Sequence, residues 1–281
     1  MVSAFRELKS QFTSFWRLKK LKALAANSDG SFAGEFQYLK QLTEQLTIKT
    51  GSVLDIAASD GYSQSSTLGF YRNGWGGLAV EMDPLKFSTL SFLYADFPKV
   101  SLARSRVTPH NVVSMLEAFE VREIAILNLD IDSYDLSVIE AILSRGYLPQ
   151  IISMEINEKI PPGVYFAVNF SEDLFWQGDH FYGCSLDAAA LSIRAYGYSL
   201  VSVEFNNAFF VRNDIAGDTF TDLSVLEAWN SGYRYKPNRR DLFPWNRDVD
   251  NWMDSTPEEA LNHIKKYFCK YDGLYTLKLE S

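Results

Sequence analysis

The stretch VLDIAASDGYSQS, residues 53–65, contains a short apolar run that ends in Asp55. Two small residues follow it, and Ser59-Asp60-Gly61 then lead into a polar stretch that could open a helix. Small residues and glycine let a ligand approach the backbone closely. The stretch therefore predicts a ligand-binding turn with two carboxylates at the end of a buried strand.

From this stretch onward, short apolar runs alternate with helix-like segments, and the chain ends this pattern with two strands joined at Asn206-Asn207. The predicted strands cover residues 52–57, 76–82, 100–107, 124–131, 149–156 and the hairpin 198–213. The predicted helices cover residues 63–73, 84–96, 112–119, 136–146 and 185–197. Such alternation with nearly continuous apolar strands is typical of an α/β fold whose parallel sheet is covered on both faces. We expect a mostly parallel, Rossmann-like seven-stranded sheet with an antiparallel C-terminal hairpin.

Composition narrows the classes of function. The 281 residues carry a formal net charge of −8, which argues against a nucleic-acid-binding protein because such proteins present a basic face. Cys184 and Cys269 lie too far apart for a zinc motif and are too few for a disulfide framework. No apolar run reaches the length of a membrane span, and the N-terminus lacks the features of a signal peptide. These features favour a cytoplasmic location.

The chain divides into three expected parts. Residues 1–32 hold a basic amphipathic helix, predicted over 1–26, that could cover the domain, form a dimer contact or lie on an anionic membrane. Residues 33–213 hold the α/β domain, which opens with a helix over 33–47. Residues 214–281 form an aromatic-rich extension with one clear helix at 257–271, which we interpret as a lid or contact surface.

Charged or polar residues follow five consecutive predicted strands. Ligands of open parallel sheets bind at the carboxyl ends of the strands, so these residues are expected at one site. They are Asp55 with Ser59, Asp60 and Gly61; Glu81 and Asp83; Arg106; Asp130 and Asp132; and Glu155, Asn157 and Glu158. Solvated strand ends explain any single member, but the recurrence across the sheet favours a site.

The turn after the first strand indicates which ligand to expect. Neither G-x-G-x-x-G nor G-x-x-x-x-G-K-[ST] is present, and a carboxylate-rich turn repels phosphate. Such a turn suits a ligand with a cationic amino group and neutral hydroxyls. Glu81, about twenty residues after the turn, is placed to accept both hydroxyls of a ribose. An amino acid joined to a ribose without phosphate points to S-adenosyl-L-methionine.

The segment VLDIAASDGYSQSSTLGFYRNGWGGLAVEMDP, residues 53–84, resembles the opening of class I methyltransferases, and specifically the FkbM family. That family carries an "hhDIGAxDGxxxSNT" turn followed by "GWxGhhhE", where h is apolar. Ala57 departs from the glycine that is usual there, and its methyl group would crowd the cofactor slightly. ILNLDIDSYD, residues 126–135, resembles both the FkbM "KIDVEG" strand and the "IDxDxY" strand of macrocin-type sugar O-methyltransferases, which use a divalent metal. The resemblance covers about residues 36–212 and implies the methyltransferase version of the fold.

The resemblance also implies a cofactor site. Asp55, Ser59, Asp60 and Gly61 would surround the methionine part, and Glu81 would bind the ribose. Met82 and the Arg106-Val107 turn would flank the adenine. The full set of implied cofactor-binding residues is Asp55, Ala57, Ser59, Asp60, Gly61, Glu81, Met82, Arg106, Val107 and Asp130.

Two further expectations concern the acceptor side. Asp130, Glu155 and Asn157 form an oxygen-rich set suited to Mg²⁺, since alternation along a strand places Asp130 with Asp132 and Glu155 with Asn157. In the alternative, the aspartates only bind the cofactor and shape a turn. Asp132 is the first candidate for the catalytic base. His180, in an aromatic loop before a helix that Ser185 could cap, is the second.

Three functions remain open on the sequence. The first is S-adenosylmethionine-dependent methylation of an oxygen in a sugar or secondary metabolite, with a small-molecule or carbohydrate acceptor and a possible homodimer. The second is a methyltransferase-fold binding module that has lost its activity and serves a protein partner. The third is an α/β enzyme that uses another nucleoside, which the missing phosphate loop disfavours.

Overall fold

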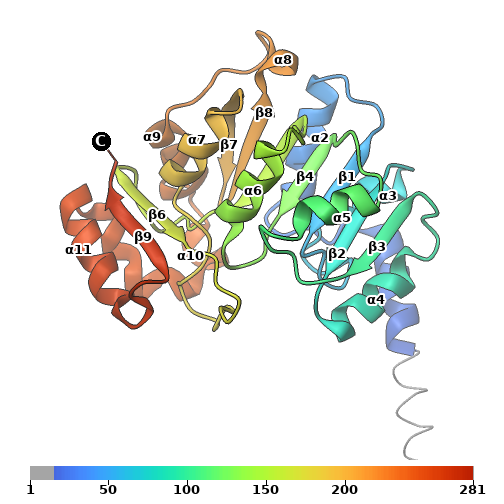
Figure 1. Cartoon of the computed structure of the whole chain (residues 1–281), viewed down its shortest axis with the longest axis horizontal. Helices are drawn as coiled ribbons and strands as arrows, with labels where there is room; N and C mark the ends of the chain where they lie inside the picture. Colours follow the sequence, from blue (N-terminus) through green and yellow to red (C-terminus); the bar gives the residue numbers. More distant parts are fainter. Residues whose placement is uncertain (1–15, 281) are drawn as a thin grey trace, which may run out of the picture.

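The computed structural model describes residues 16–280 and shows one seven-stranded sheet in the order β3-β2-β1-β4-β5-β8-β7 (Figure 1). All its strands from β3 to β5 pair in parallel, and β8 pairs antiparallel with both β5 and β7. The predicted fold class, a mostly parallel Rossmann-like seven-stranded sheet with an antiparallel C-terminal hairpin, is confirmed. The strands are β1 (Ser52–Ile56), β2 (Gly76–Glu81), β3 (Val100–Arg104), β4 (Ile126–Leu129), β5 (Ile151–Glu155), β7 (Tyr198–Glu204) and β8 (Asn207–Arg212).

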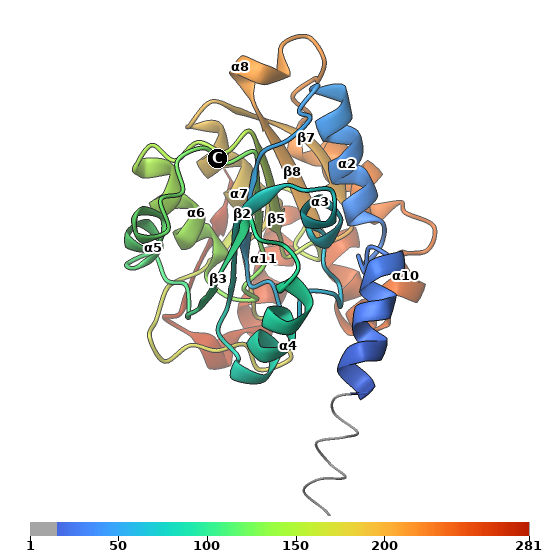
Figure 2. The same ribbon diagram turned by 90° about the vertical axis from the view of Figure 1, so that its right-hand side faces the viewer.

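Helices cover both faces of the sheet (Figure 2). One face is packed by α5 (Val112–Ala118), α6 (Asp135–Ser144) and α7 (Leu186–Arg194). The other face is packed by α2 (Glu35–Gln45), α3 (Leu68–Arg72) and α4 (Pro84–Tyr94). The helix cap expected at Ser185 is confirmed, because the Ser185 side chain accepts a hydrogen bond from the backbone N–H of Ala188 at the start of α7.

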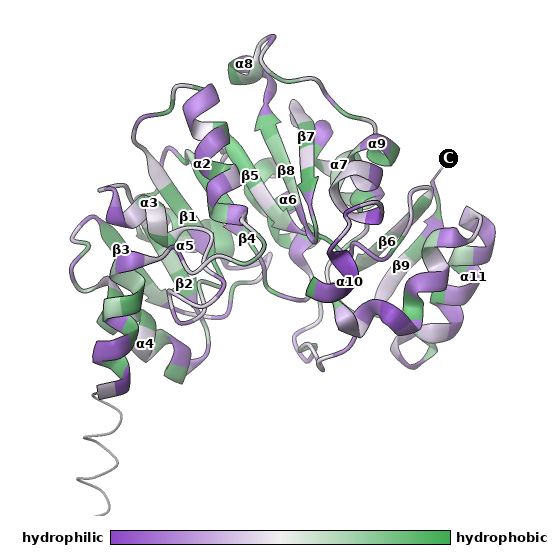
Figure 3. Ribbon diagram, turned by 180° about the vertical axis from the view of Figure 1, so that it is seen from behind, coloured by the Kyte–Doolittle hydropathy of each residue, from purple (hydrophilic) through white to green (hydrophobic). Residues whose placement is uncertain are grey.

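Burial explains why the strands read as apolar runs. All five residues of β5 and four of the five in β1 are buried, and Figure 3 shows the strands as the most hydrophobic part of the sheet domain. A strand that is covered on both faces has no polar side to alternate with. The strand order reverses between β1 and β4, so the carboxyl ends of these two strands flank the crevice where such sheets bind ligands.

A second sheet was not predicted from the sequence. β6 (Val164–Val168) lies in a segment interpreted as a loop, and it pairs antiparallel with β9 (Tyr275–Leu279) near the C-terminus. Its partner is more than a hundred residues away, so no local pattern announces the pairing. Phe166 of β6 packs against Phe268, which places the C-terminal extension in the same hydrophobic cluster as the large sheet.

The remaining extension is built from short helices. They are α8 (Asn213–Ala216), α9 (Val225–Trp229), the π-helix η1 (Asn230–Arg234), α10 (Arg239–Leu242), the 3₁₀ helix η2 (Pro244–Asp254), α11 (Pro257–Tyr267) and the 3₁₀ helix η3 (Cys269–Tyr271). α11 matches the helix expected at 257–271, and the Thr256 side chain caps its first turn.

The N-terminal helix is described only in part. Residues 16–27 are helical, and the expected helical pattern over residues 1–15 lies outside the described residues. Within the described part of the chain, no helix is both long and apolar enough to cross a membrane.

Candidate functional site

A cavity of about 390 Å³ lies at the carboxyl ends of β1, β2 and β4. Eight of the ten residues that the sequence assigned to a cofactor line it: Asp55, Ala57, Ser59, Glu81, Met82, Arg106, Val107 and Asp130. Asp60 and Gly61 are not among its lining residues. The turn between β1 and α3 therefore does form a cavity wall, through fewer of its residues than expected. We call this space the donor cavity, after the methyl donor that the sequence predicts there.

Glu81 is the best-anchored carboxylate of the donor cavity. It is the last residue of β2 and is only 5% exposed. Its Oε2 accepts a hydrogen bond from the backbone N–H of Ser59 at 2.9 Å, and its Oε1 accepts one from the N–H of Asp83 at 2.7 Å. These bonds fix both oxygens in place, and each oxygen keeps a further acceptor site, so the carboxylate is pre-organised to receive a pair of hydroxyls.

The turn after β1 is held in an unusual backbone conformation. Ala57, Ser59 and Gln64 have φ values of 70°, 52° and 60°, although none is a glycine. The N–H groups of Ala57 and Ala58 both donate to the carbonyl of Val80 on β2. A residue that carries a side chain pays free energy when its backbone adopts the left-handed region, and such strain is concentrated at functional sites.

Asp60 and Gly61 serve the turn itself. Asp60 Oδ1 accepts hydrogen bonds from the N–H groups of Tyr62 and Ser63, at 2.9 and 2.7 Å. Gly61 has a φ of +80°, and a Cβ at this position would lie 2.7 Å from Leu90 and 2.8 Å from Tyr94. These two residues therefore shape the turn. In a sequence, a residue that shapes a turn cannot be told from one that contacts a ligand.

Asp55 is buried at the floor of the donor cavity. Its Oδ2 accepts a hydrogen bond from the Thr67 hydroxyl at 2.6 Å, and its Oδ1 accepts one from the Asn128 amide at 3.0 Å. Burial raises the pKa of this carboxyl, and the two hydrogen bonds act in the opposite direction. Asp55 thus links β1 to β4 and to the start of α3.

The donor cavity is poorly suited to phosphate. Its walls include the carboxylates of Asp55, Glu81, Asp83, Asp130 and Asp132. The cations among the lining residues in the described part of the chain are Lys86 and Arg106. The Arg106 guanidinium is already occupied, because it donates to the Tyr134 hydroxyl and to the backbone carbonyls of residues 171, 172 and 174. These contacts support the expectation of a ligand without phosphate.

The apolar wall of the donor cavity comes from two places. Met82 and Val107 follow β2 and β3, as the sequence predicted. Leu174, Phe175 and Trp176 come from the loop between β6 and α7, which the sequence did not place here. The Arg106 guanidinium lies 4.3 Å from the centroid of the Phe175 ring and so holds this loop over the cavity.

A second cavity of about 660 Å³ adjoins the first. We call it the acceptor cavity, after the methyl acceptor that the sequence predicts on this side. Four residues line both cavities: Gln64, Asp130, Asp132 and Trp176. The C-terminal extension contributes Phe243, Trp245, Asp248 and Tyr267 to its walls. A molecule in one cavity would therefore meet a molecule in the other at the end of β4.

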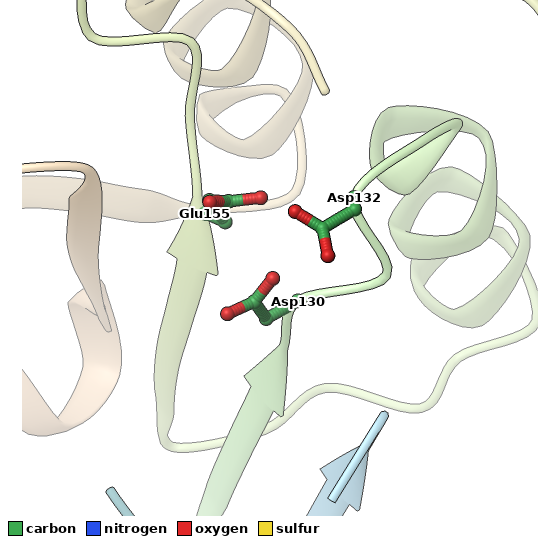
Figure 4. A group of neighbouring side chains, drawn as sticks. All are labelled: Asp130, Asp132 and Glu155. Carbon is green, nitrogen blue, oxygen red and sulfur yellow. The ribbon is translucent and has the colours of Figure 1, made fainter. Parts of the chain in front are cut away.

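Three carboxylates converge where the two cavities meet. Asp130 follows β4, Asp132 lies in the next turn and Glu155 ends β5, and Figure 4 shows their side chains pointing toward one another. Carboxylate oxygens of the three residues lie within 4.8 Å of one another. Burial and the neighbouring negative charges raise the pKa of Asp130 to about 8 and that of Glu155 well above its usual value.

The carboxylate oxygens of this cluster are suitable ligands for a hard divalent cation. Glu155 Oε1 accepts a hydrogen bond from the Asn206 amide at 3.0 Å, whereas its buried Oε2 has no hydrogen-bond partner among the described residues. A buried acceptor without a partner is costly, and a cation would satisfy it. Asp130, Asp132 and Glu155 are thus the residues that could hold such an ion.

The cluster forms for a different reason from the one the sequence suggested. β4 ends at Leu129, so strand alternation does not extend to Asp132; this residue instead has a φ of 54° in the turn before α6. Asn157 lies beyond the end of β5 and lines neither cavity. Its amide nitrogen donates to the backbone carbonyls of His180 and Tyr182, at 2.8 and 3.0 Å, and so braces the loop that carries His180.

Glu35 joins the acidic wall from α2, and sequence reasoning missed it. It is buried, lines the acceptor cavity and accepts a hydrogen bond from Asn207 at 2.7 Å. Burial, reinforced by the charge of Asp130, raises the pKa of Glu35 to about 8. The signal available in the sequence was a glutamate at the start of the helix expected over residues 33–47, but no strand-end pattern points to it.

A buried polar network supports the far wall of the acceptor cavity. Lys159 and Glu158 form a fully buried ion pair with nitrogen and oxygen 3.3 Å apart, and Tyr182 bonds to both side chains. Asn246 of η2 donates to Glu158 Oε1 at 2.6 Å. Burial lowers the pKa of Lys159, against the opposing effect of the nearby carboxylates. The network ties the end of β5 to the C-terminal extension.

His180 lines the acceptor cavity beside Asp248 and Tyr267. Its Nε2 lies 3.0 Å from Asp248 Oδ1, and the Tyr267 hydroxyl donates to Asp248 Oδ2 at 2.8 Å. The sequence predicted His180 but neither partner, because both come from the extension some seventy residues or more along the chain. Burial and the charge of Lys159 lower the pKa of His180.

No protein-family model and no curated protein sequence matches the chain. Among solved structures, it is similar to a S-adenosylmethionine-dependent methyltransferase from Clostridium acetobutylicum at 10% identity and a TM-score of 0.41, over 73% of this chain and 99% of that one. The N-terminal domain of EvdMO1, solved in the presence of SAH and D-fucose, matches at 9% identity and a TM-score of 0.41, over 63% and 82%. The [4+2]-cyclase SpnF matches at 14% identity and a TM-score of 0.40, over 86% and 79%.

Proposed function

We propose that this protein is a S-adenosyl-L-methionine-dependent methyltransferase that acts on an oxygen of a sugar or secondary metabolite. The observation that carries the proposal is the pair of cavities that meet at the end of β4 and share Asp130, Asp132, Gln64 and Trp176. Group transfer needs two substrates held with their reacting atoms in contact, and this arrangement provides for it.

The donor cavity supports the choice of cofactor. Glu81 presents a fixed carboxylate for ribose hydroxyls, and the small side chains of Ala57 and Ala58 leave the backbone of the turn accessible. Five lining carboxylates favour a cationic ligand over a phosphate. A sulfonium with an amino-acid tail and a ribose meets these requirements.

The acceptor cavity restricts the second substrate. Six carboxylates line it: Glu35, Asp130, Asp132, Glu155, Asp179 and Asp248. Among residues 16–280, no lysine or arginine lines it. An acceptor that carries phosphate or carboxylate groups finds no basic side chain of the described residues to pair with, whereas a neutral polyhydroxyl compound finds many hydrogen-bonding groups and aromatic faces. This favours a carbohydrate-like acceptor.

We also infer a divalent cation, such as Mg²⁺, at Asp130, Asp132 and Glu155. When bound there, such a cation lowers the pKa of a coordinated hydroxyl and orients it. The acidic cluster favours the macrocin-type resemblance over the FkbM type, because the former uses a metal. Asp132 then belongs to the cation site, which weakens its assignment as the free base.

Calorimetry with S-adenosylhomocysteine tests the proposal directly. We expect saturable binding of one molecule per chain to the purified protein, with no binding of NAD or ATP. A protein that binds no S-adenosylhomocysteine would be a scaffold without the cofactor, and the binding-module alternative would replace the enzyme. Binding of a phosphorylated nucleotide in its place would favour the third alternative.

The cation site gives a prediction of its own. Mg²⁺ titrated into the metal-free protein should release heat of binding, and Glu155→Gln should weaken this binding at least tenfold because it removes one anionic ligand. Asp173→Asn, a change at an exposed carboxylate outside both cavities, should leave it unchanged. Equal Mg²⁺ affinity in the wild-type protein and Glu155→Gln would remove the site.

A further inference from the structure

The C-terminal extension places a carboxylate behind His180, which lines the acceptor cavity. Asp248 of η2 lies 3.0 Å from His180 Nε2, and Tyr267, the last residue of α11, donates to the other oxygen of Asp248. The ring of Tyr267 also packs against the His180 ring, with centroids 5.8 Å apart. Two elements of the extension, η2 and α11, thus hold one imidazole in place.

This contact determines which nitrogen of His180 is available. The pKa of Asp248 is lowered by its hydrogen bonds to Tyr267 and His180, so it is an ionised carboxylate that can only accept. The proton of neutral His180 is therefore held on Nε2. Nδ1 then carries the free lone pair, because the side-chain hydrogen bond that the His180 ring makes among the described residues goes through Nε2 to Asp248.

We propose that His180, acting through Nδ1, is the base that takes the acceptor's proton, and that Asp248 and Tyr267 of the C-terminal extension position it. This assignment rests on the proposed function. It gives the extension a part in catalysis, which neither its composition nor the fold implies.

The proposed step balances. The acceptor O–H bond breaks and its proton goes to His180 Nδ1, while the oxygen lone pair forms the new bond to the methyl carbon. The carbon–sulfur bond of the sulfonium breaks, and its electron pair stays on sulfur as a neutral thioether. The resulting imidazolium is stabilised by the Asp248 carboxylate, as a carboxylate behind a catalytic histidine does.

The surroundings of His180 suit a base that is neutral before the step. Lys159, in the buried network behind the loop, disfavours the imidazolium, whereas Asp248 and Glu158 favour it. Burial adds to the effect of Lys159, and the net result is a pKa below the ordinary value of histidine. Tyr267, whose ring packs against that of His180, stays neutral because burial and Asp248 raise its pKa to about 12.

Nitrogen-15 NMR of the full-length protein tests the assignment without a known acceptor. The chain has three histidines, so a His180→Gln sample identifies the signals of His180. We expect neutral His180 to show a protonated Nε2 and an unprotonated Nδ1. In Asp248→Asn, the population of the Nδ1–H tautomer should rise at least fivefold, and the pKa of His180 should fall. Asp179→Asn is the matched control, because this carboxylate lines the same cavity but bonds to Lys270 and Tyr271.

Two results would overturn the proposal. The first is a wild-type spectrum with the proton on Nδ1, which needs no variant and so does not depend on how a variant folds. The second is a folded Asp248→Asn protein whose His180 tautomer and pKa match those of the wild type. S-adenosylhomocysteine affinity is measured on the same samples and should stay within twofold in His180→Gln, since His180 does not line the donor cavity. Loss of cofactor binding in the wild-type protein would instead overturn the proposed function.

Discussion

Glu81 and Asp60 look alike in the sequence, as carboxylates near the ends of the first two strands, but the structure gives them different roles. Both accept two backbone N–H groups. Glu81 does so while facing the donor cavity, whereas Asp60 does so within its own turn. Only the packing of β2 against the turn separates the two roles, and a single sequence does not encode that packing locally.

Glu81→Gln should weaken the binding of S-adenosylhomocysteine by about 2 kcal/mol, or roughly thirtyfold in Kd. The amide keeps one acceptor oxygen but replaces the other with a donor, so one charged hydrogen bond to the ribose is lost. Calorimetry on the purified variant measures the change. An affinity equal to that of the wild-type protein would mean that the ribose lies elsewhere.

Asp60→Asn is the matched control for this prediction. It removes the same charge from the neighbouring turn, and we expect the affinity for S-adenosylhomocysteine to change by less than threefold. The unfolding temperature should fall by a few degrees, because the turn loses charged acceptors for Tyr62 and Ser63. A large loss of affinity with unchanged stability would return Asp60 to the ligand.

At the scale of elements, the sequence predicted what local patterns encode. The strands of the large sheet and their helices were found because each is a continuous apolar run or an amphipathic segment of its own. β6 and β9 were missed because VYFAV and YTLKL are short and become strands by pairing with each other across the chain. The loop that covers the donor cavity was missed for a related reason: its position depends on Arg106.

Arg106→Lys should loosen the loop at residues 169–182. Lysine cannot reproduce the bonds that the guanidinium makes to Tyr134 and to the carbonyls of Ser171 and Leu174. We expect chymotrypsin to cleave after Leu174, Phe175 or Trp176 at least tenfold faster than in the wild-type protein. S-adenosylhomocysteine affinity should fall as well, since these three residues line the donor cavity.

Arg104→Lys provides the comparison, because Arg104 ends β3 only two residues before Arg106 but is exposed and lines neither cavity. Its cleavage rate should match that of the wild-type protein. If both variants were cleaved equally fast, the loop would be held by its own packing. Protection of the Arg106→Lys loop on addition of S-adenosylhomocysteine would show that the ligand and the guanidinium hold the same element.

For the molecule as a whole, the acceptor cavity joins parts that are far apart in the chain. Glu35 comes from the N-terminal side, the acidic cluster from the middle strands, and Asp248 and Tyr267 from the extension. Bringing so many carboxylates together costs stability, since each buried charge disfavours the others. Without a ligand, such an acidic site makes the protein less stable than a site with neutral side chains would. This loss of stability is expected where the side chains are arranged for binding rather than for folding.

The cost should appear in the pH dependence of stability. The pKa of Glu35 is raised from 4.5 to about 8 in the folded protein. Below pH 4.5 the carboxyl is protonated in both states, so the shift has no effect. Between these values the unfolded chain releases a proton that the folded protein keeps, and the free energy of unfolding therefore decreases as the pH rises. At pH 7 the loss from this one group is on the order of 3 kcal/mol.

Glu35→Gln should therefore be more stable than the wild-type protein at pH 7, and the difference should shrink toward zero as the pH falls to 4.5. Glutamine keeps the oxygen that accepts from Asn207 and carries no charge to bury. Urea unfolding in EDTA, at a series of pH values, measures this difference. Glu44→Gln on the same helix is the control, because Glu44 is exposed and its removal should change stability by less than about 0.5 kcal/mol at every pH. A Glu35→Gln variant that follows the wild-type pH profile would mean that Glu35 ionises normally in the folded protein, and that the acidic wall is more open to water than its burial implies.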